Sequence, residues 1–224
     1  MSAPVPEAPR DCQLCPRLVA YRRDNAAAEP AWFNGAVPSF PPPGGDSSVH
    51  LLIVGLAPGR TGANRTGRPF TGDWAGDLLY GSLLRHGLAR GSYDRRADDG
   101  LALQRTMITN AVRCAPPQNK PTGAEVTRCR TFLAARIACL PELRTVLCLG
   151  KIAHDATVRA LGGRIAALPF GHGSRYEVAC TQRTLTLRSS YHCSRYNTST
   201  KRLTEDMFDA VIAQCAMDIG RKAG

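Results

Sequence analysis

Short apolar segments alternate with longer segments of helical periodicity along most of the chain. Four short segments are rich in apolar or β-branched residues and bounded by turn residues, as strands are: 49–55, 105–112, 144–149 and 184–190. Helical spacing of apolar residues is found at about 74–87, 122–138, 151–161 and 204–220. An earlier helix is expected from Asp11 to about Asp24. This alternation predicts a three-layer α/β/α fold around a central four-stranded parallel sheet.

The chain has 224 residues, of which 43% are hydrophobic, and this length suits one domain with a substantial core. We expect a disordered, proline-rich leader over residues 1–10 and a single domain over residues 11–224. The sequence holds neither a run of eighteen apolar residues nor the apolar N-terminal segment of a signal peptide. A cytoplasmic protein without a membrane partner is therefore expected.

Basic residues outnumber acidic ones by 29 to 18, which gives a formal net charge of +11 and a pI near 9.6. For a cytoplasmic domain this balance favours a polyanionic partner, most often nucleic acid. Aromatic residues make up only 6% of the chain, so a stacking platform for long single strands is not expected.

Nine cysteines in such a chain argue against a disulfide framework and favour a metal site or buried thiols. Cys12 and Cys15 form a C-x-x-C at the head of the first expected helix, which places both thiols on one face. Cys114 follows a strand, and Cys129 lies on the next helix. Zinc and an iron–sulfur cluster both accept four cysteines, and the wide spacing from 114 to 129 fits the bulkier cluster better.

The loop from Gly55 to Asp73 follows an apolar strand and reads G-L-A-P-G-R-T-G-A-N-R-T-G-R-P-F-T-G-D. Glycine lets backbone approach a ligand closely and arginine supplies rigid donors, so this composition indicates a pocket, with a structural turn as the alternative. The loop has neither the Gly-Lys-Ser/Thr of an NTPase phosphate loop nor the dinucleotide pattern G-x-G-x-x-G. Ligands of parallel sheets bind at the carboxyl ends of the strands, where Asn110 and His192 are also expected.

Several motifs together resemble the uracil-DNA glycosylase superfamily, and within it the iron–sulfur family 5 (type B) enzymes. They are G-L-A-P-G with N-R-T-G-R-P-F-T-G-D, I-T-N-A-V-R-C, S-Y-H-C-S, W-F-N-G-A-V-P-S-F and G-H-G. The resemblance implies a monomeric enzyme of base excision repair, associated with the nucleoid, that flips and excises uracil and other deaminated bases such as hypoxanthine from DNA. It also implies a 4Fe-4S cluster on Cys12, Cys15, Cys114 and Cys129. Because no lysine is placed for Schiff-base chemistry, a monofunctional glycosylase is expected.

The resemblance also implies roles for residues of this rim. Phe70 would stack on the flipped base, Asn110 would bind the pyrimidine edge, and His192 would donate a hydrogen bond to the departing base. The expected catalytic residues are His192, Asp73 and Asn110. The expected substrate-binding residues are Gly55, Leu56, Ala57, Pro58, Gly59, Asn64, Phe70, Asn110 and His192. The expected DNA contacts are Arg65, Arg68, Ser194, Arg195, Tyr196, Asn197, Lys201 and Arg202, with Tyr196 and Asn197 filling the vacated stack.

Two departures from the superfamily pattern bear on the chemistry. Leu56 and Ala57 occupy positions where other branches carry Asp or Glu, which leaves Asp73 as the best-placed carboxylate, with a helix cap as its alternative role. Cys193 replaces the usual proline of the His-Pro-Ser motif, and a fully apolar setting for it is not expected in this polar segment. Two other functions therefore stay open: a DNA lesion-binding module that does not cut, and a hydrolase of free deaminated nucleotides.

Overall fold

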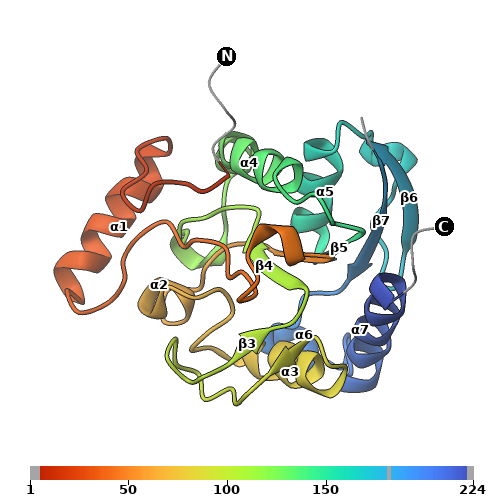
Figure 1. Ribbon diagram of the computed structural model, residues 1–224. Helices are drawn as coiled ribbons and strands as arrows, with labels where there is room; N and C mark the ends of the chain where they lie inside the picture. The colour runs from red at the N-terminus through yellow and green to blue at the C-terminus, as the bar shows by residue number, and fades with distance from the viewer. Residues whose placement is uncertain (1–5, 181–182, 221–224) are drawn as a thin grey trace.

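The central sheet has five strands in the order β4-β1-β5-β7-β6 (Figure 1). The computed structural model describes residues 6–180 and 183–220. The four predicted strands are present and parallel: β1 (Leu51–Gly55), β4 (Thr106–Asn110), β5 (Thr145–Leu149) and β7 (Arg183–Ser190). A fifth strand, β6 (Arg175–Cys180), pairs antiparallel to β7 at the edge and was not predicted. Only one of its six residues is buried, so it lacks the apolar run by which the buried strands are recognised.

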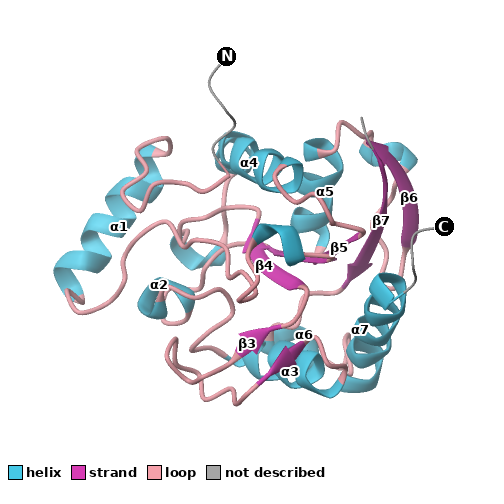
Figure 2. Ribbon diagram, in the orientation of Figure 1, coloured by secondary structure: helices cyan, strands magenta, loops and turns pink. Residues whose placement is uncertain are grey.

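Helices cover both faces of the sheet, which confirms the three-layer α/β/α fold (Figure 2). Leu52 and Val54 of β1 belong to the core that includes α4 (Gly123–Ala138) and α5 (Lys151–Ala160). Leu51 and Ile53 belong to the core that includes α3 (Trp74–Arg85) and α7 (Glu205–Gly220). Successive strand residues alternate between faces, so one apolar strand supplies side chains to both cores.

The N-terminal segment differs from the prediction in two ways. Helix α1 begins at Pro16 and ends at Ala28, so Cys12 and Cys15 lie in the loop before it and not on its face. Proline favours the first helical position and holds the preceding residue extended, as observed for Cys15 (φ −122°, ψ 93°). Glu7 forms ion pairs with Arg113 and Arg136, so the expected disorder of the leader is wrong for residues 6–10. Residues 1–5 lie outside the described residues.

Short elements complete the fold. A two-stranded ribbon of β2 (Ala89–Arg90) and β3 (Ala102–Leu103) lies beside α3 in Figure 1. Helices α2 (Ala63–Thr66) and α6 (Arg195–Ser199) each form about one turn. Three 3₁₀ turns cover Asp46–Ser48, Pro117–Asn119 and Ile165–Ala167. Over the part of the chain that the structure describes, no helix is both long and apolar enough to cross a membrane.

Candidate active site

The carboxyl ends of β1 and β4 bring a glycine and an amide side chain together. Gly55 and Asn110 are paired in the register of the two strands. A Cβ atom at Gly55 would lie 2.4 Å from Asn110 Oδ1 and 2.6 Å from Phe70 Cζ. Only a residue without a side chain fits there, because real Cβ contacts are never that short. The Asn110 amide and the Phe70 ring therefore converge above the strand end, as predicted.

The Phe70 ring also faces His192. The two ring centroids are 5.9 Å apart, with 26° between the ring planes. Phe70 has a φ of 53°, a left-handed conformation that non-glycine residues rarely adopt. Such a conformation persists only where neighbouring contacts hold it, and it recurs in binding sites. Three of the predicted site residues are thus brought together from three separate segments.

His192 follows the end of β7 and is held through its backbone. Asn197 Nδ2 donates a hydrogen bond of 2.8 Å to the His192 carbonyl oxygen. Within residues 6–180 and 183–220, the buried Nδ1 atom of His192 has no hydrogen-bond partner. Burial lowers the pKa of His192 to about 4, so the imidazole is neutral at pH 7. One ring nitrogen of a neutral imidazole carries a proton and donates hydrogen bonds.

Asp73 is the N-cap of α3, and its carboxylate also faces the glycine loop. Its Oδ1 accepts a hydrogen bond of 3.2 Å from the Ala75 amide. Its Oδ2 would lie 2.4 Å from a Cβ atom at Gly62 and 3.0 Å from one at Gly59. Burial raises the pKa of Asp73 above its ordinary value, despite the hydrogen bonds from the helix amides. The helix cap is confirmed, and the second oxygen lies within the loop.

The rest of the loop divides between pocket wall and support. Leu56 lines a hollow that His192 also lines, whereas Ala57 packs against the core on the α4 side of the sheet. Pro58 is buried and Gly59 half-buried, and the Gly59 carbonyl accepts from the Asn64 amide. Asn64 is 1% exposed, and its Nδ2 donates to Asn34 Oδ1 at 3.0 Å. This geometry makes Asn64 a brace of the loop and gives no support to the predicted substrate contact.

The hollow beside His192 includes residues that the sequence analysis did not select. Gly150, Lys151, Phe170 and Tyr191 line it together with Arg202. Lys151 Nζ lies 2.6 Å from Asp155 Oδ2, so its charge is paired in this structure. Gly150 and Lys151 could have been selected from the sequence, because they stand where a buried strand ends and a helix begins. Ligands of parallel sheets bind at such strand ends.

An exposed basic and aromatic face lies around α6. The Arg195 guanidinium is 5.7 Å from the centre of the Trp74 ring, and Arg202 is 4.6 Å from that of Tyr191. Tyr196 is 73% exposed, and Lys201 is exposed as well. This segment therefore presents basic and aromatic side chains to solvent, and the DNA contacts on it stay a prediction. Ser194 caps α6, however, and Asn197 is tied to the His192 carbonyl, so both also support the turn.

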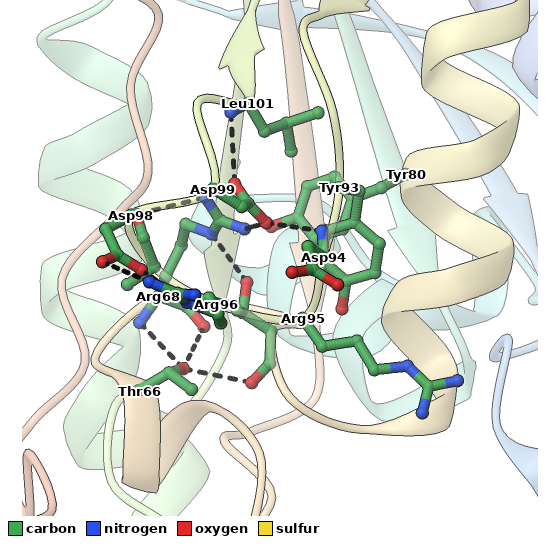
Figure 3. A network of polar contacts seen from close by, with 12 residues as sticks. Thr66, Arg68, Tyr80, Tyr93, Asp94, Arg95, Arg96, Asp98, Asp99 and Leu101 are labelled. Carbon is green, nitrogen blue, oxygen red and sulfur yellow. Dashed lines mark hydrogen bonds and ion pairs between the residues drawn. The ribbon is translucent and has the colours of Figure 1, made fainter.

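The two arginines predicted as DNA contacts in the glycine loop differ in setting. Arg65 is exposed, although its Nε donates to the Thr61 carbonyl oxygen at 2.8 Å. Arg68 is only 5% exposed and forms two hydrogen bonds, of 2.7 and 2.8 Å, with the Asp99 carboxylate (Figure 3). The prediction of a phosphate contact by Arg68 is therefore wrong, because a buried ion pair already holds its guanidinium.

Cys193 is fully buried in the core on the α3 and α7 side of the sheet. Burial raises the pKa of its thiol well above the ordinary value, so the thiol is neutral. The expectation that this position is not apolar is wrong, because the turn after β7 directs residue 193 inward while His192 lies at the rim. Cys193 thus acts as a small core residue.

The four selected cysteines line one largely apolar hollow between the N-terminal loop and α4. Arg22 Nη1 donates to Cys114 Sγ at 3.6 Å, and the Arg113 amide donates to Cys129 Sγ at 3.3 Å. Burial raises the pKa of Cys114 to about 11 and that of Cys129 to about 12. Among the described residues, no group of three or more His, Cys, Asp or Glu side chains converges closely enough to hold a single metal ion.

Comparisons with known proteins agree with this geometry. A family model described as "Uracil DNA glycosylase superfamily" matches residues 42–216. The chain is 43% identical to a type-5 uracil-DNA glycosylase of Thermus thermophilus, over 95% of this chain and 94% of the relative. It is 37% identical to one of Pyrobaculum aerophilum, over 94% and 90%. It is 40% identical to one of Mycobacterium tuberculosis, over 91% and 76%. The chain belongs to the uracil DNA glycosylase superfamily.

Proposed function

We propose that this chain excises uracil from DNA by hydrolysing the bond between the base and its deoxyribose. The observation that carries the proposal is the convergence of Phe70, Asn110 and His192 at a sheet edge that Gly55 leaves open. A ring, an amide and a neutral imidazole are the groups needed to hold a base extruded from a duplex. Relatives that match more than nine-tenths of the chain are named uracil-DNA glycosylases.

Each of the three side chains has a distinct task in this reaction. Phe70 stacks on the extruded base, and Asn110 offers an amide donor and acceptor to the pyrimidine edge. As the C1′–N1 bond breaks, its electron pair moves onto the base, and His192 donates a hydrogen bond to the base oxygen that gains negative charge. Water then forms the new bond to C1′, and the proton that it loses ends on the released base anion. Because His192 is neutral, its hydrogen bond stabilises the charge on the base without forming an ion pair that would hold the base in the site.

Asp73 is the carboxylate that supports the sugar side of the reaction. It lies between the loop at Gly59 and Gly62 and the turn at Cys193, whose thiol its charge affects. A negative charge there favours the cationic character that the deoxyribose acquires when the base leaves. Because Leu56 and Ala57 carry no ionisable group, no strong base acts from those positions. Leaving-group stabilisation then dominates, which we propose extends the substrates to other deaminated bases such as hypoxanthine.

Tyr196 is the side chain placed to fill the space that the extruded base vacates, since it is the most exposed large apolar residue on α6. We expect Tyr196→Gly to slow excision most in well-paired duplex and least in single strands, because unstacking is least costly where the base is unpaired. Single-turnover rates on both substrates check this. Arg195→Gln is the matched control. This variant should weaken binding to damaged and undamaged duplex alike. It should also reduce, by about one unit, the slope of the logarithm of the binding constant against the logarithm of the salt concentration. Equal slowing by Tyr196→Gly on both substrates would show that Tyr196 does not fill the space left by the extruded base.

We further propose that Cys12, Cys15, Cys114 and Cys129 hold a 4Fe-4S cluster. The hollow that they line fits the group, since it is apolar and two N–H donors already point at sulfur atoms. Zinc also accepts four cysteines, so metal analysis must separate the two groups. When bound, the cluster supplies a covalent tie between the N-terminal loop, the segment after β4 and α4, and no step of the base excision passes through it.

Cys129→Ala is expected to remove the cluster, because it deletes one of four ligands. The purified variant should lose its absorbance at about 400 nm and its iron, whereas Cys180→Ala on the edge strand should keep about four iron atoms per chain. Iron and zinc analysis of both proteins makes the measurement. Zinc in place of iron in the unmodified chain, or full iron content in Cys129→Ala, would refute the assignment.

Substrate tests separate the rival functions. A uracil-DNA glycosylase releases free uracil from oligonucleotides and leaves abasic DNA that breaks only after alkali. A lesion-binding module would bind the same duplex without releasing base, and a nucleotide hydrolase would act on free deaminated nucleotides. We propose a monofunctional enzyme that works as one copy at the nucleoid, because a single chain supplies every group named above. The Lys151 ammonium is paired with Asp155, so it is no free amine for Schiff-base chemistry.

A further inference from the structure

The segment between Gly91 and Leu101 connects β2 to β3, and its composition is that of a polar surface loop. The structure instead directs two of its side chains inward. Asp99 has a side chain that is 1% exposed, and it pairs with Arg68 of the glycine loop. Tyr93 packs its ring against that of Tyr80 on α3, with 4.6 Å between the ring centroids. Figure 3 shows the Arg68 guanidinium at the Asp99 carboxylate, and the guanidinium also lies 5.5 Å and 5.9 Å from the ring centres of Tyr80 and Tyr93.

The Asp99 carboxylate is fixed on all sides. Besides the two bonds from Arg68, it accepts hydrogen bonds from the backbone amides of Asp94 (2.9 Å) and Leu101 (3.1 Å). Although burial by itself raises it, these partners lower the pKa of Asp99 to about 2. The ion pair is therefore charged throughout the neutral range. It gives the loop a rigid attachment to Arg68.

From Arg68 the contacts continue to the residues on either side of Phe70. Arg68 Nε donates to Thr71 Oγ1 at 2.7 Å, and that hydroxyl donates to the Pro69 carbonyl oxygen. The Tyr80 hydroxyl donates to the same Pro69 oxygen at 2.5 Å. The backbone on either side of Phe70 is thus held by side chains of its own loop and by Tyr80 of α3.

Phe70 itself is reached by Tyr93. The Tyr93 hydroxyl donates to the Phe70 carbonyl oxygen at 3.1 Å. A Cβ atom at Gly76 would lie 2.0 Å from that oxygen and 2.1 Å from the Tyr93 hydroxyl, so the bond is tightly enclosed. The left-handed backbone of Phe70 needs such support, since an unconstrained phenylalanine leaves that conformation.

We propose that the segment from Gly91 to Leu101 is a positioning element of the active site, in which Tyr93 and Asp99 hold Phe70 in the conformation that places its ring over the base. The inference rests on the proposed function for its effect on excision. Tyr93 and Asp99 are positioning residues, because they act through Phe70 and Arg68. Tyr93 and Asp99 both reach residues 68–71 from this segment, and Arg95 adds an ion pair with Asp77 on α3.

Tyr93→Phe tests the element because it removes the hydroxyl and keeps the ring. We expect the single-turnover excision rate on uracil duplex to fall about tenfold, the effect of losing one hydrogen bond that orients a reacting group. Tyr176→Phe on the edge strand β6 is the matched control. It removes a hydroxyl that bonds the Pro169 carbonyl oxygen and should keep the wild-type rate. If Tyr93 acts through Phe70, Tyr93→Phe adds nothing in a Phe70→Ala background. Multiplying losses, or an unchanged rate in Tyr93→Phe alone, overturn the proposal.

A second readout does not depend on activity. The NMR resonances of the Phe70 ring, assigned by their loss in Phe70→Leu, should shift in Tyr93→Phe and in Asp99→Asn and stay in place in Tyr176→Phe. Unmoved Phe70 resonances in a folded Tyr93→Phe protein refute the positioning role whatever the enzyme does. Failure of the wild-type chain to release uracil refutes the proposed function instead, so the two failures are distinguishable.

Discussion

Replacing His192 with alanine is expected to slow uracil excision about a hundredfold or more, equivalent to roughly 3 kcal/mol of transition-state stabilisation. The imidazole faces Phe70 across the site, and its buried Nδ1 has no partner among the residues that the structure describes. Its loss therefore removes an interaction with the departing base and leaves the fold intact. Single-turnover excision at saturating enzyme measures the effect.

The control for His192 is His86→Ala. His86 is the C-cap of α3, at the opposite end of that helix from Asp73, and it bonds Asp209 of α7. Its loss should therefore leave the excision rate unchanged. Binding of undamaged duplex should be the same for both variants, because His192 is neutral and His86 is bonded to Asp209. A His192→Ala protein that excises uracil at the wild-type rate shows that another group stabilises the departing base.

Gly55→Ala is expected to reduce excision by about a hundredfold as well, although it adds only one methyl group. That methyl would overlap Asn110 Oδ1 at 2.4 Å and Phe70 Cζ at 2.6 Å, so both side chains must move. A displacement of about 1 Å in a positioned group costs on the order of a hundredfold in rate. Gly55 pairs with Asn110 at the last position of β1, so the strand itself should persist.

Gly123→Ala provides the comparison for Gly55→Ala. Nothing lies within 4 Å of a Cβ atom at Gly123, which begins α4, so this variant should keep the wild-type excision rate. Thermal unfolding of both variants separates misplacement from loss of fold. An active Gly55→Ala enzyme would mean that Phe70 and Asn110 do not have to meet above the strand end.

The buried strands could be predicted from the sequence because a short, continuous apolar run is typical of a strand that is buried on both faces. Leu51 to Val54 are buried on both faces of the sheet, and a run of that kind is typical of a parallel strand. Strand β6 was missed because only one of its six residues is buried, which leaves no such run. The predicted start of helix α1 was too early, because the C-x-x-C pattern was given more weight than the preference of Pro16 for the first helical position.

The candidate site was predicted where motif and strand end coincide, as for Asn110 and His192. Arg68 was assigned wrongly because an arginine in a glycine-rich loop resembles an anion ligand, and its partner Asp99 is 31 residues away in the sequence. Cys193 was misjudged for a similar reason. Its neighbours are polar, but the turn sends alternate side chains to the rim and to the core, and only the folded chain shows which goes where.

The central claim is that the rim formed by Gly55, Phe70, Asn110 and His192 excises uracil. The most direct test measures free uracil released from a duplex with one uracil opposite guanine, by the wild-type chain and by His192→Ala and Gly55→Ala. The account predicts release by the wild-type chain and a loss of about a hundredfold in each variant. No release by a folded wild-type chain, or equal release by all three proteins, would contradict it.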